Sequence, residues 1–173
     1  MNKFVLAVLP LVLLPVQSVL AVDGTAVELG YGVGTKMVRL TTDWNWHKQW
    51  DVGRNWTASG LWEAGIGNWH NDRTGGRTLW EIGLTPVLRL NSKHSGFFWE
   101  AGIGVHIMSQ NRIDASRVFG SHFNFGDHIG FGWHLGDHGR YELGYRFQHL
   151  SNGDTTMPNA GINFQQIRLG YNF

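Results

Sequence analysis

The sequence predicts an all-β fold, an eight-stranded antiparallel β-barrel that crosses a membrane, and three observations point to it. Apolar and polar residues alternate with a period of two, which is the pattern of strands with two different faces. After Ala21 no apolar run is long enough for a membrane-spanning helix. The chain has 24 glycines, nine tryptophans and ten phenylalanines but no cysteine, so a closed barrel in lipid, rather than disulfides, would hold it together.

The N-terminus has the pattern of a secretory signal peptide. A basic start that includes Lys3 leads into an apolar stretch from Phe4 to Val19, and Ala21 is a small residue suited to cleavage. A transmembrane helix is the alternative, but the stretch is short and contains two prolines. We therefore expect residues 1–21 to be a signal peptide and residues 22–173 to form the barrel.

The net charge of the chain argues against a nucleic-acid partner. Removal of Lys3 with the signal peptide leaves 13 basic and 13 acidic side chains, so the remaining chain has a net charge near zero. Proteins that bind nucleic acid present a basic surface, and we therefore expect no nucleic-acid partner.

The first four predicted strands precede residue 91. The alternation is weakest in residues 25–33 and 36–46 and clearer in residues 56–67. It is strongest in residues 77–90, where every second residue from Trp80 onward is apolar and the residues between them include Glu81, Gly83 and Arg89. The stretch between the second and third strands is longer than a tight turn, and the pattern does not explain its length.

The last four predicted strands are residues 97–108, 119–135, 140–150 and 164–173. In a soluble barrel the apolar face would point inward, but here the opposite arrangement fits better. The polar faces combine Glu and Arg with Gly, which suits a small filled lumen, and the apolar faces are bulky and aromatic, which suits lipid. The chain ends on Phe173, and this ending resembles the C-terminal strand of outer-membrane barrels.

One pair of residues in the seventh strand points to chemistry. His149 and Ser151 lie two residues apart, so they share a face of the strand with about 7 Å between their Cα atoms. A serine hydroxyl becomes a nucleophile when a base removes its proton, and histidine can act as that base near neutral pH. From the spacing alone, two unrelated polar residues at a strand end are the favoured interpretation.

Strand parity strengthens the catalytic interpretation. His149 and Ser151 continue the apolar series Tyr141, Leu143 and Tyr145, so they should face the membrane rather than the lumen. Polar side chains are costly there unless they lie at the interface or have a function. With the N-terminus on the periplasmic side, the pair would lie at the outer-leaflet end of the strand, where an enzyme acting on a lipid would need it.

At these residues the chain resembles the lipid A 3-O-deacylase (PagL) family. The resemblance is tight over residues 123–130 and 149–164 and loose elsewhere. It implies a Gram-negative outer-membrane ester hydrolase that acts on lipid A in lipopolysaccharide through a Ser-His-Glu triad without a cofactor, and it allows a homodimer. By position, Ser151 corresponds to the nucleophile, His149 to the base and Asn159 to the asparagine of the oxyanion hole.

The third member of the implied triad differs. Asn163 stands where the family has Glu, and an asparagine can orient a histidine but cannot stabilise its positive charge. Asp127 is an alternative acid, because pairing across the turn at residues 136–139 places it beside Phe147 or His149 on the outward face. A bond from Asp127 to a nearby aromatic or backbone group is the competing interpretation.

The other histidines do not predict a metal site. His122, His128 and His134 are each six residues apart, about 20 Å along a strand, so one ion cannot be held by all three. We expect neither a metal nor a cofactor. Two rival functions stay open: a non-catalytic small outer-membrane barrel, and a phospholipase or acyltransferase on the same scaffold.

Overall fold

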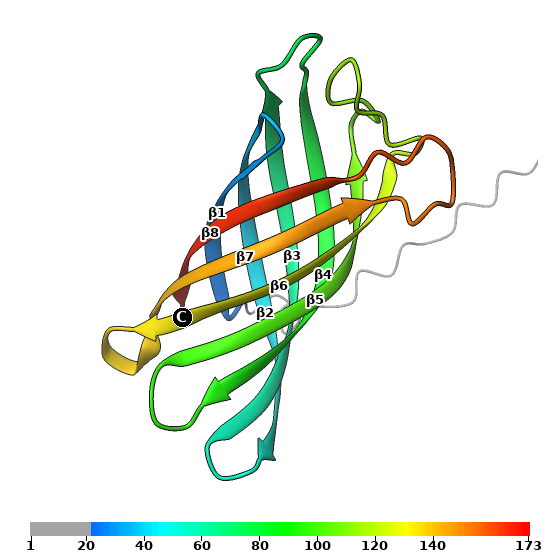
Figure 1. Ribbon diagram of the computed structural model, residues 1–173. Coiled ribbons are helices and arrows are strands. Elements are labelled where there is room, and N and C mark those ends of the chain that lie inside the picture. The colour runs from blue at the N-terminus through cyan, green and yellow to red at the C-terminus, as the bar shows by residue number, and fades with distance from the viewer. Residues whose placement is uncertain (1–21) are drawn as a thin grey trace, which may run out of the picture.

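The computed structural model describes residues 22–173, which form a closed antiparallel barrel in which each strand pairs with the next and β1 pairs with β8 (Figure 1). The predicted fold class is therefore confirmed. The predicted signal peptide, residues 1–21, lies outside the described residues. The strands are β1 (Gly24–Gly32), β2 (Thr35–Val52), β3 (Trp56–Asn71), β4 (Thr78–Ser92), β5 (Phe97–Met108), β6 (Phe123–Leu135), β7 (Tyr141–Ser151) and β8 (Ile162–Asn172).

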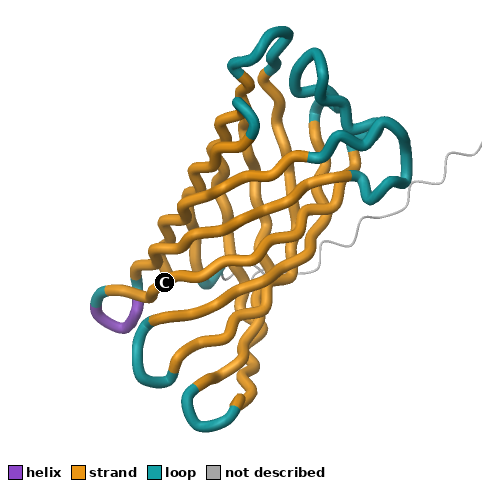
Figure 2. Tube along the Cα trace, in the orientation of Figure 1, coloured by secondary structure: helices purple, strands orange, loops and turns teal. Residues whose placement is uncertain are grey.

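The two ends of the barrel differ (Figure 2). At one end, the terminal end, the Phe173 N–H donates to the Asp23 carbonyl at 2.9 Å, and short turns join the strands. One of these turns holds the short 3-10 helix η2 (Asp137–Gly139). At the other end, the loop end, lie the connections 33–34, 72–77, 109–122 and 152–161. Over the described range no helix is long and apolar enough to cross a membrane.

The long stretch after the second predicted strand is mostly strand. β2 continues to Val52, and only three residues separate it from β3. The pairing register shifts between Asn45 and Gln49, and His47 between them has a φ of 52°. This irregularity interrupts the period-two pattern, so the sequence-based end of the second strand at residue 46 was wrong.

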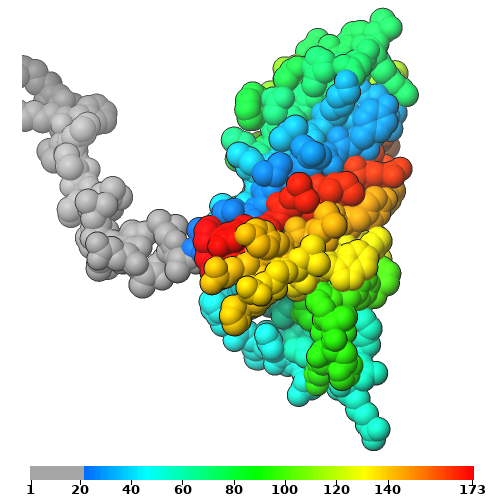
Figure 3. Space-filling model, turned by 90° about the vertical axis from the view of Figure 1, so that its left-hand side faces the viewer, coloured from blue at the N-terminus to red at the C-terminus, as the bar shows by residue number. Residues whose placement is uncertain are grey.

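The polar faces of the strands point into the barrel, as predicted. In β7 the buried residues Glu142 and Arg146 alternate with the exposed residues Leu143 and Phe147. Figure 3 shows the outer wall, where β8, β7 and β6 form neighbouring inclined bands. The apolar residues on this wall suit contact with acyl chains, because every backbone group in a closed barrel is paired without water.

A network of ion pairs fills the middle of the lumen. Arg146 contacts Glu28 of β1 at 2.6 Å and Glu63 of β3 at 2.8 Å, and it also bonds Glu100 of β5. Each of the other arginines of the network also forms ion pairs with two or more carboxylates. They are Arg39, Arg89 and Arg168. Because each guanidinium joins different strands, the network links opposite walls of the barrel.

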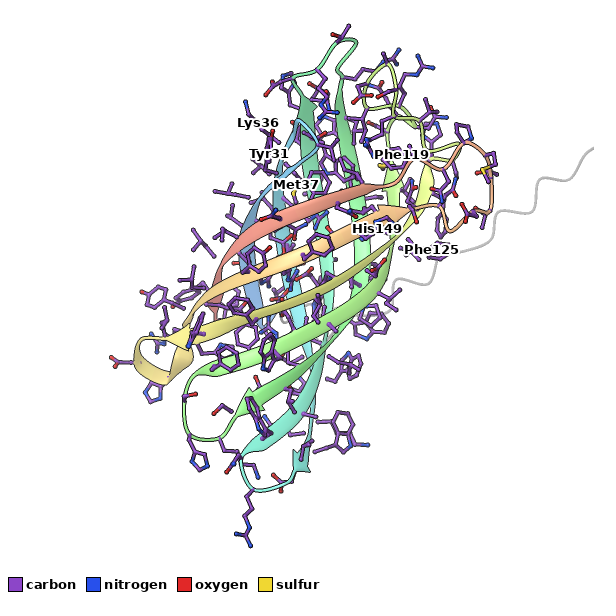
Figure 4. All side chains as sticks on the ribbon, in the orientation of Figure 1. Tyr31, Lys36, Met37, Phe119, Phe125 and His149 are labelled. Atoms are coloured by element: carbon purple, nitrogen blue, oxygen red, sulfur yellow. The ribbon has the colours of Figure 1, made fainter. Side chains whose placement is uncertain are left out.

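An apolar cluster closes the lumen at the loop end. Its members come from six strands and from residues 109–122, and two of them, Met37 and Phe119, are labelled in Figure 4. Phe119 was predicted to begin the sixth strand, but β6 begins at Phe123, and Phe119 instead turns inward from the preceding loop. The cluster consists of Met37, Trp69, Leu79, Met108, Ile113, Phe119, Leu150, Ile162 and Phe164. Burial of Ile113 and Phe119 in this cluster therefore anchors residues 109–122 to the loop end of the barrel.

Candidate active site

His149 and Ser151 are among the last three residues of β7, next to the loop end (Figure 4 labels His149). Their neighbours Gln148 and Leu150 are 2% and 0% exposed and point inward. His149 and Ser151 are half-buried and face away from the lumen, as the parity of the strand predicts. Phe125, the register partner of Ser151 on β6, is an exposed aromatic residue, so the pair borders an apolar surface.

His149 lies between two polar residues in one row of the sheet. The register pairs it with Asp127 on β6 and with Asn163 on β8. The predicted proximity of Asp127 to His149 is therefore confirmed. Residues directly opposite one another on antiparallel strands have Cβ atoms about 5 Å apart, so both neighbours lie within reach of the imidazole.

The two neighbours make different contacts. His149 Nδ1 lies 2.5 Å from Asn163 Oδ1. Because Asn163 Oδ1 can only accept a hydrogen bond, Nδ1 carries the proton and Nε2 is left as the basic nitrogen. The Asp127 side chain is exposed and makes no hydrogen bond or ion pair with another residue of the described chain. Asn163 thus orients the imidazole, while Asp127 places a carboxylate on its other side.

Ser151 Oγ accepts a hydrogen bond from the Gly153 N–H at 3.4 Å. Within residues 22–173, no hydrogen bond joins Ser151 to His149. In enzymes without bound substrate such bonds are often long and tighten only in the complex. The Gly153 N–H is a donor beside the hydroxyl that the sequence did not single out.

Residues 152–161, which we call the site loop, hold Asn159. Asn159 Oδ1 accepts from the Asn152 N–H at 3.1 Å, and Asn159 Nδ2 donates to Asp154 Oδ1 at 2.9 Å. Since Asn152 directly follows Ser151, the first bond ties the Asn159 amide to the end of β7. One hydrogen of Nδ2 remains available to a ligand.

Gly161 is a further part of the site that sequence reasoning missed. It has a φ of 53°, a conformation that favours glycine. A Cβ at this position would lie 3.0 Å from His149 Cε1 and 3.5 Å from Ser151 Cβ. The backbone of Gly161 therefore lies directly against both residues, and the glycine before the last strand is the sequence signal that could have revealed it.

The histidines considered for a metal are dispersed in the structure. His128 is buried in the lumen, whereas His122 lies outside β6 and bonds the Met108 carbonyl at 2.7 Å. No group of three His, Asp or Glu side chains in the described part of the chain is arranged to hold a metal ion.

The fold and the site together define a membrane-type β-barrel with a His-Ser pair on its lipid-facing wall. The chain belongs to the lipid A 3-O-deacylase (PagL) family, whose family model matches residues 30–172. The predicted resemblance is thereby confirmed.

Individual relatives agree with this assignment. The chain is 32% identical over 152 residues to the lipid A deacylase PagL of Bordetella bronchiseptica, an alignment that covers 85% of this chain and 83% of the relative. The crystal structure of the outer membrane enzyme PagL superimposes with a TM-score of 0.77 at 27% identity, covering 87% of this chain and 99% of that one. Neisserial surface protein A shares the fold alone, with a TM-score of 0.54 at 9% identity over 87% of this chain and 94% of its own.

Proposed function

We propose that the protein is an outer-membrane serine esterase that hydrolyses the 3-O-linked acyl chain of lipid A in lipopolysaccharide. Family membership supports the ester hydrolase activity and the lipid substrate. The single observation that carries the assignment of residues is the 2.5 Å bond between His149 and Asn163, because it leaves Nε2 of His149 free on the face that it shares with Ser151.

In the first half of the reaction, Ser151 Oγ attacks the ester carbonyl carbon while His149 Nε2 takes the hydroxyl proton. The carbonyl oxygen becomes an oxyanion, and the Asn159 amide and the Gly153 N–H are the donors that stabilise it. When the intermediate collapses, the C–O bond to the sugar breaks and His149 returns the proton to the sugar oxygen. The acyl group is then bound to Ser151.

In the second half, a water molecule attacks the acyl-enzyme. His149 removes a proton from this water, and the bond between Ser151 Oγ and the acyl carbon breaks with return of the proton to the serine. The products are free Ser151 and a fatty acid. No cofactor takes part in these steps.

Two residues share the work of the usual triad acid. Asn163 orients His149 through the Nδ1 bond, and the Asp127 carboxylate stabilises the imidazolium that forms when Nε2 is protonated. Their positions on opposite sides of His149 in one sheet row support this division. A carboxylate that faces lipid without a partner in the described chain is costly, and a transient positive charge beside it gives it a role.

The outer wall beside the site suits an acyl chain. Phe125 lies in the same sheet row as Ser151, and Ile129 and Phe147 form a row nearer the terminal end; all three are exposed on the lipid-facing side of β6 and β7. An acyl chain lying along these residues would stay in the bilayer while its ester reaches Ser151 at the membrane surface. We further expect removal of residues 1–21 as a signal peptide and association into a homodimer, which N-terminal sequencing and cross-linking in isolated outer membranes test.

In the decisive experiment, the purified protein is incubated with lipopolysaccharide in detergent micelles, and the mass of the lipid A is measured by mass spectrometry. We expect loss of one hydroxyacyl unit with the wild type, none with Ser151→Ala or His149→Ala, and full activity with Ser95→Ala, a control in the turn between β4 and β5. Unchanged lipid A would support a non-catalytic barrel. Gain of a chain would support an acyltransferase, and an effect on phospholipids alone a phospholipase.

A further inference from the structure

The loop between β5 and β6, residues 109–122, packs against the site loop at the loop end of the barrel (Figure 1). We call it the support loop. The Ala160 N–H donates to the Val118 carbonyl at 3.2 Å, and Asn152 Nδ2 donates to the Phe119 carbonyl. Gly120 has a φ of 70°, and a Cβ there would lie 2.6 Å from the Pro158 carbonyl oxygen. The two loops are therefore in direct backbone contact.

Arg117 contacts the end of the site loop that borders the candidate active site. Its Nη1 donates to the Ala160 carbonyl at 3.1 Å and also to the Gly161 carbonyl. These carbonyls belong to the last two residues before β8, and Gly161 is the residue that lies against His149 and Ser151. The guanidinium thus holds the segment that lines the catalytic pair.

The support loop fixes the position of Arg117. Asp114 is 1% exposed, and its Oδ1 accepts from the Arg117 N–H at 2.7 Å, the Ser116 N–H at 2.8 Å and the Ser116 hydroxyl at 2.9 Å. A carboxylate that accepts several local N–H groups closes a tight turn. Arg117 therefore extends toward the site loop from a constrained backbone.

We infer that Arg117 is a positioning residue for the proposed deacylation, on which this inference rests. It acts through Gly161 rather than by touching the substrate. In the structure, the Ala160 and Gly161 carbonyl groups both point at the guanidinium of Arg117. Without it, the segment that carries Asn159 and Gly161 can shift relative to His149 and Ser151. Such a displacement acts on the transition state more than on substrate binding.

The test compares Arg117→Ala, Arg117→Lys and Arg112→Ala with the wild type, using the release of fatty acid from lipopolysaccharide in detergent micelles. Arg112 lies in the same support loop, is exposed and has the same charge, so it is the matched control. We expect Arg117→Ala to lower kcat by about 10- to 100-fold with KM changed less than about twofold. Arg117→Lys should recover part of the loss, and Arg112→Ala should behave as the wild type.

Chemical rescue separates positioning from loss of folding. Millimolar guanidinium, far below denaturing concentrations, should restore part of the kcat of Arg117→Ala but not that of Ser151→Ala. If Arg117→Ala had instead lost activity because the barrel was destabilised, guanidinium would not restore it. Wild-type kcat in Arg117→Ala, a rise in KM alone, or no rescue would overturn the inference. If Ser151→Ala keeps its activity, the proposed function itself has failed, and this outcome is distinct from the others.

Discussion

His149 Nδ1 bonds Asn163 Oδ1 at 2.5 Å across β7 and β8, and Asp127 occupies the register position on the opposite side of the same histidine. In the proposed mechanism, a neutral amide orients the base, and a carboxylate on the neighbouring strand supplies charge. This arrangement separates two tasks that a single glutamate performs in the Ser-His-Glu triad implied by the family resemblance. The separation can be tested one residue at a time.

Asn163→Ala removes the orienting bond, and Asp127→Asn removes only the charge. We expect Asn163→Ala to lower kcat by about 100-fold and Asp127→Asn by about tenfold, which corresponds to about 1.4 kcal/mol of transition-state stabilisation. Asn163→Glu should restore the activity of Asp127→Asn, because one residue then supplies both orientation and charge. Steady-state release of fatty acid from lipopolysaccharide measures all three variants. Full activity in both single variants would show that His149 has no such partners.

Gly161→Ala should inactivate the site without unfolding the barrel. The added Cβ would lie 3.0 Å from His149 Cε1, and the φ of 53° disfavours alanine. We expect a loss of activity of about tenfold or more, as small displacements in an active site can have that effect. The matched control is Gly53→Ala, where φ is 65° but no atom lies within 4 Å of the added Cβ. Equal activity in the two variants would contradict a close contact of Gly161 with the site.

Acid should weaken the support loop through Asp114. Burial raises the pKa of this carboxyl, but the hydrogen bonds from Ser116 and Arg117 outweigh burial and hold its pKa below the ordinary 3.8. A group with a lowered folded-state pKa stabilises the fold above its unfolded-state pKa, and this contribution is lost as the pH falls through the folded-state value.

Asp114→Asn keeps the acceptor oxygen and removes the charge, so it imitates the protonated state. We expect the wild type to have a higher Tm than Asp114→Asn by a few degrees at pH 7, with the difference shrinking once the pH falls below about 4. Calorimetry of both proteins in the same detergent measures the difference. If the difference in Tm is absent at pH 7, or stays constant down to low pH, the Asp114 charge does not have this role.

The lumen network should dominate the stability of the barrel. Arg146→Ala leaves Glu28, Glu63 and Glu100 without the cation that they share, and breaking a buried ion pair in this way costs about 3–5 kcal/mol. Urea unfolding in detergent should show this loss as a lower midpoint. Arg54→Ala, at the exposed tip of the turn between β2 and β3, should unfold like the wild type. Similar urea midpoints for both variants would show that the ion-pair network makes no net contribution to the stability of the barrel.

The sequence by itself determined the strands and the directions of their side chains. Period-two alternation is a local property of an extended backbone, so it was enough to place Glu142 and Arg146 inside and His149 and Ser151 outside. Counting across the tight turn at residues 136–139 was enough to bring Asp127 beside Phe147 or His149, because a hairpin fixes its own register, and the structure selects His149. The bulge in β2 escaped this reasoning because it breaks the period.

Only the tertiary structure decided which loop supports the site. Arg117 and Gly161 are 44 residues apart, and loops carry no periodic pattern from which their contact could be read. Antiparallel pairing of β5 through β8 places the support loop and the site loop at the same end of the barrel, and burial of Phe119 then turns the support loop toward the site loop. The partners of Arg146 depend on closure of the barrel, because Glu28, Glu63 and Glu100 reach it across the lumen from three other strands.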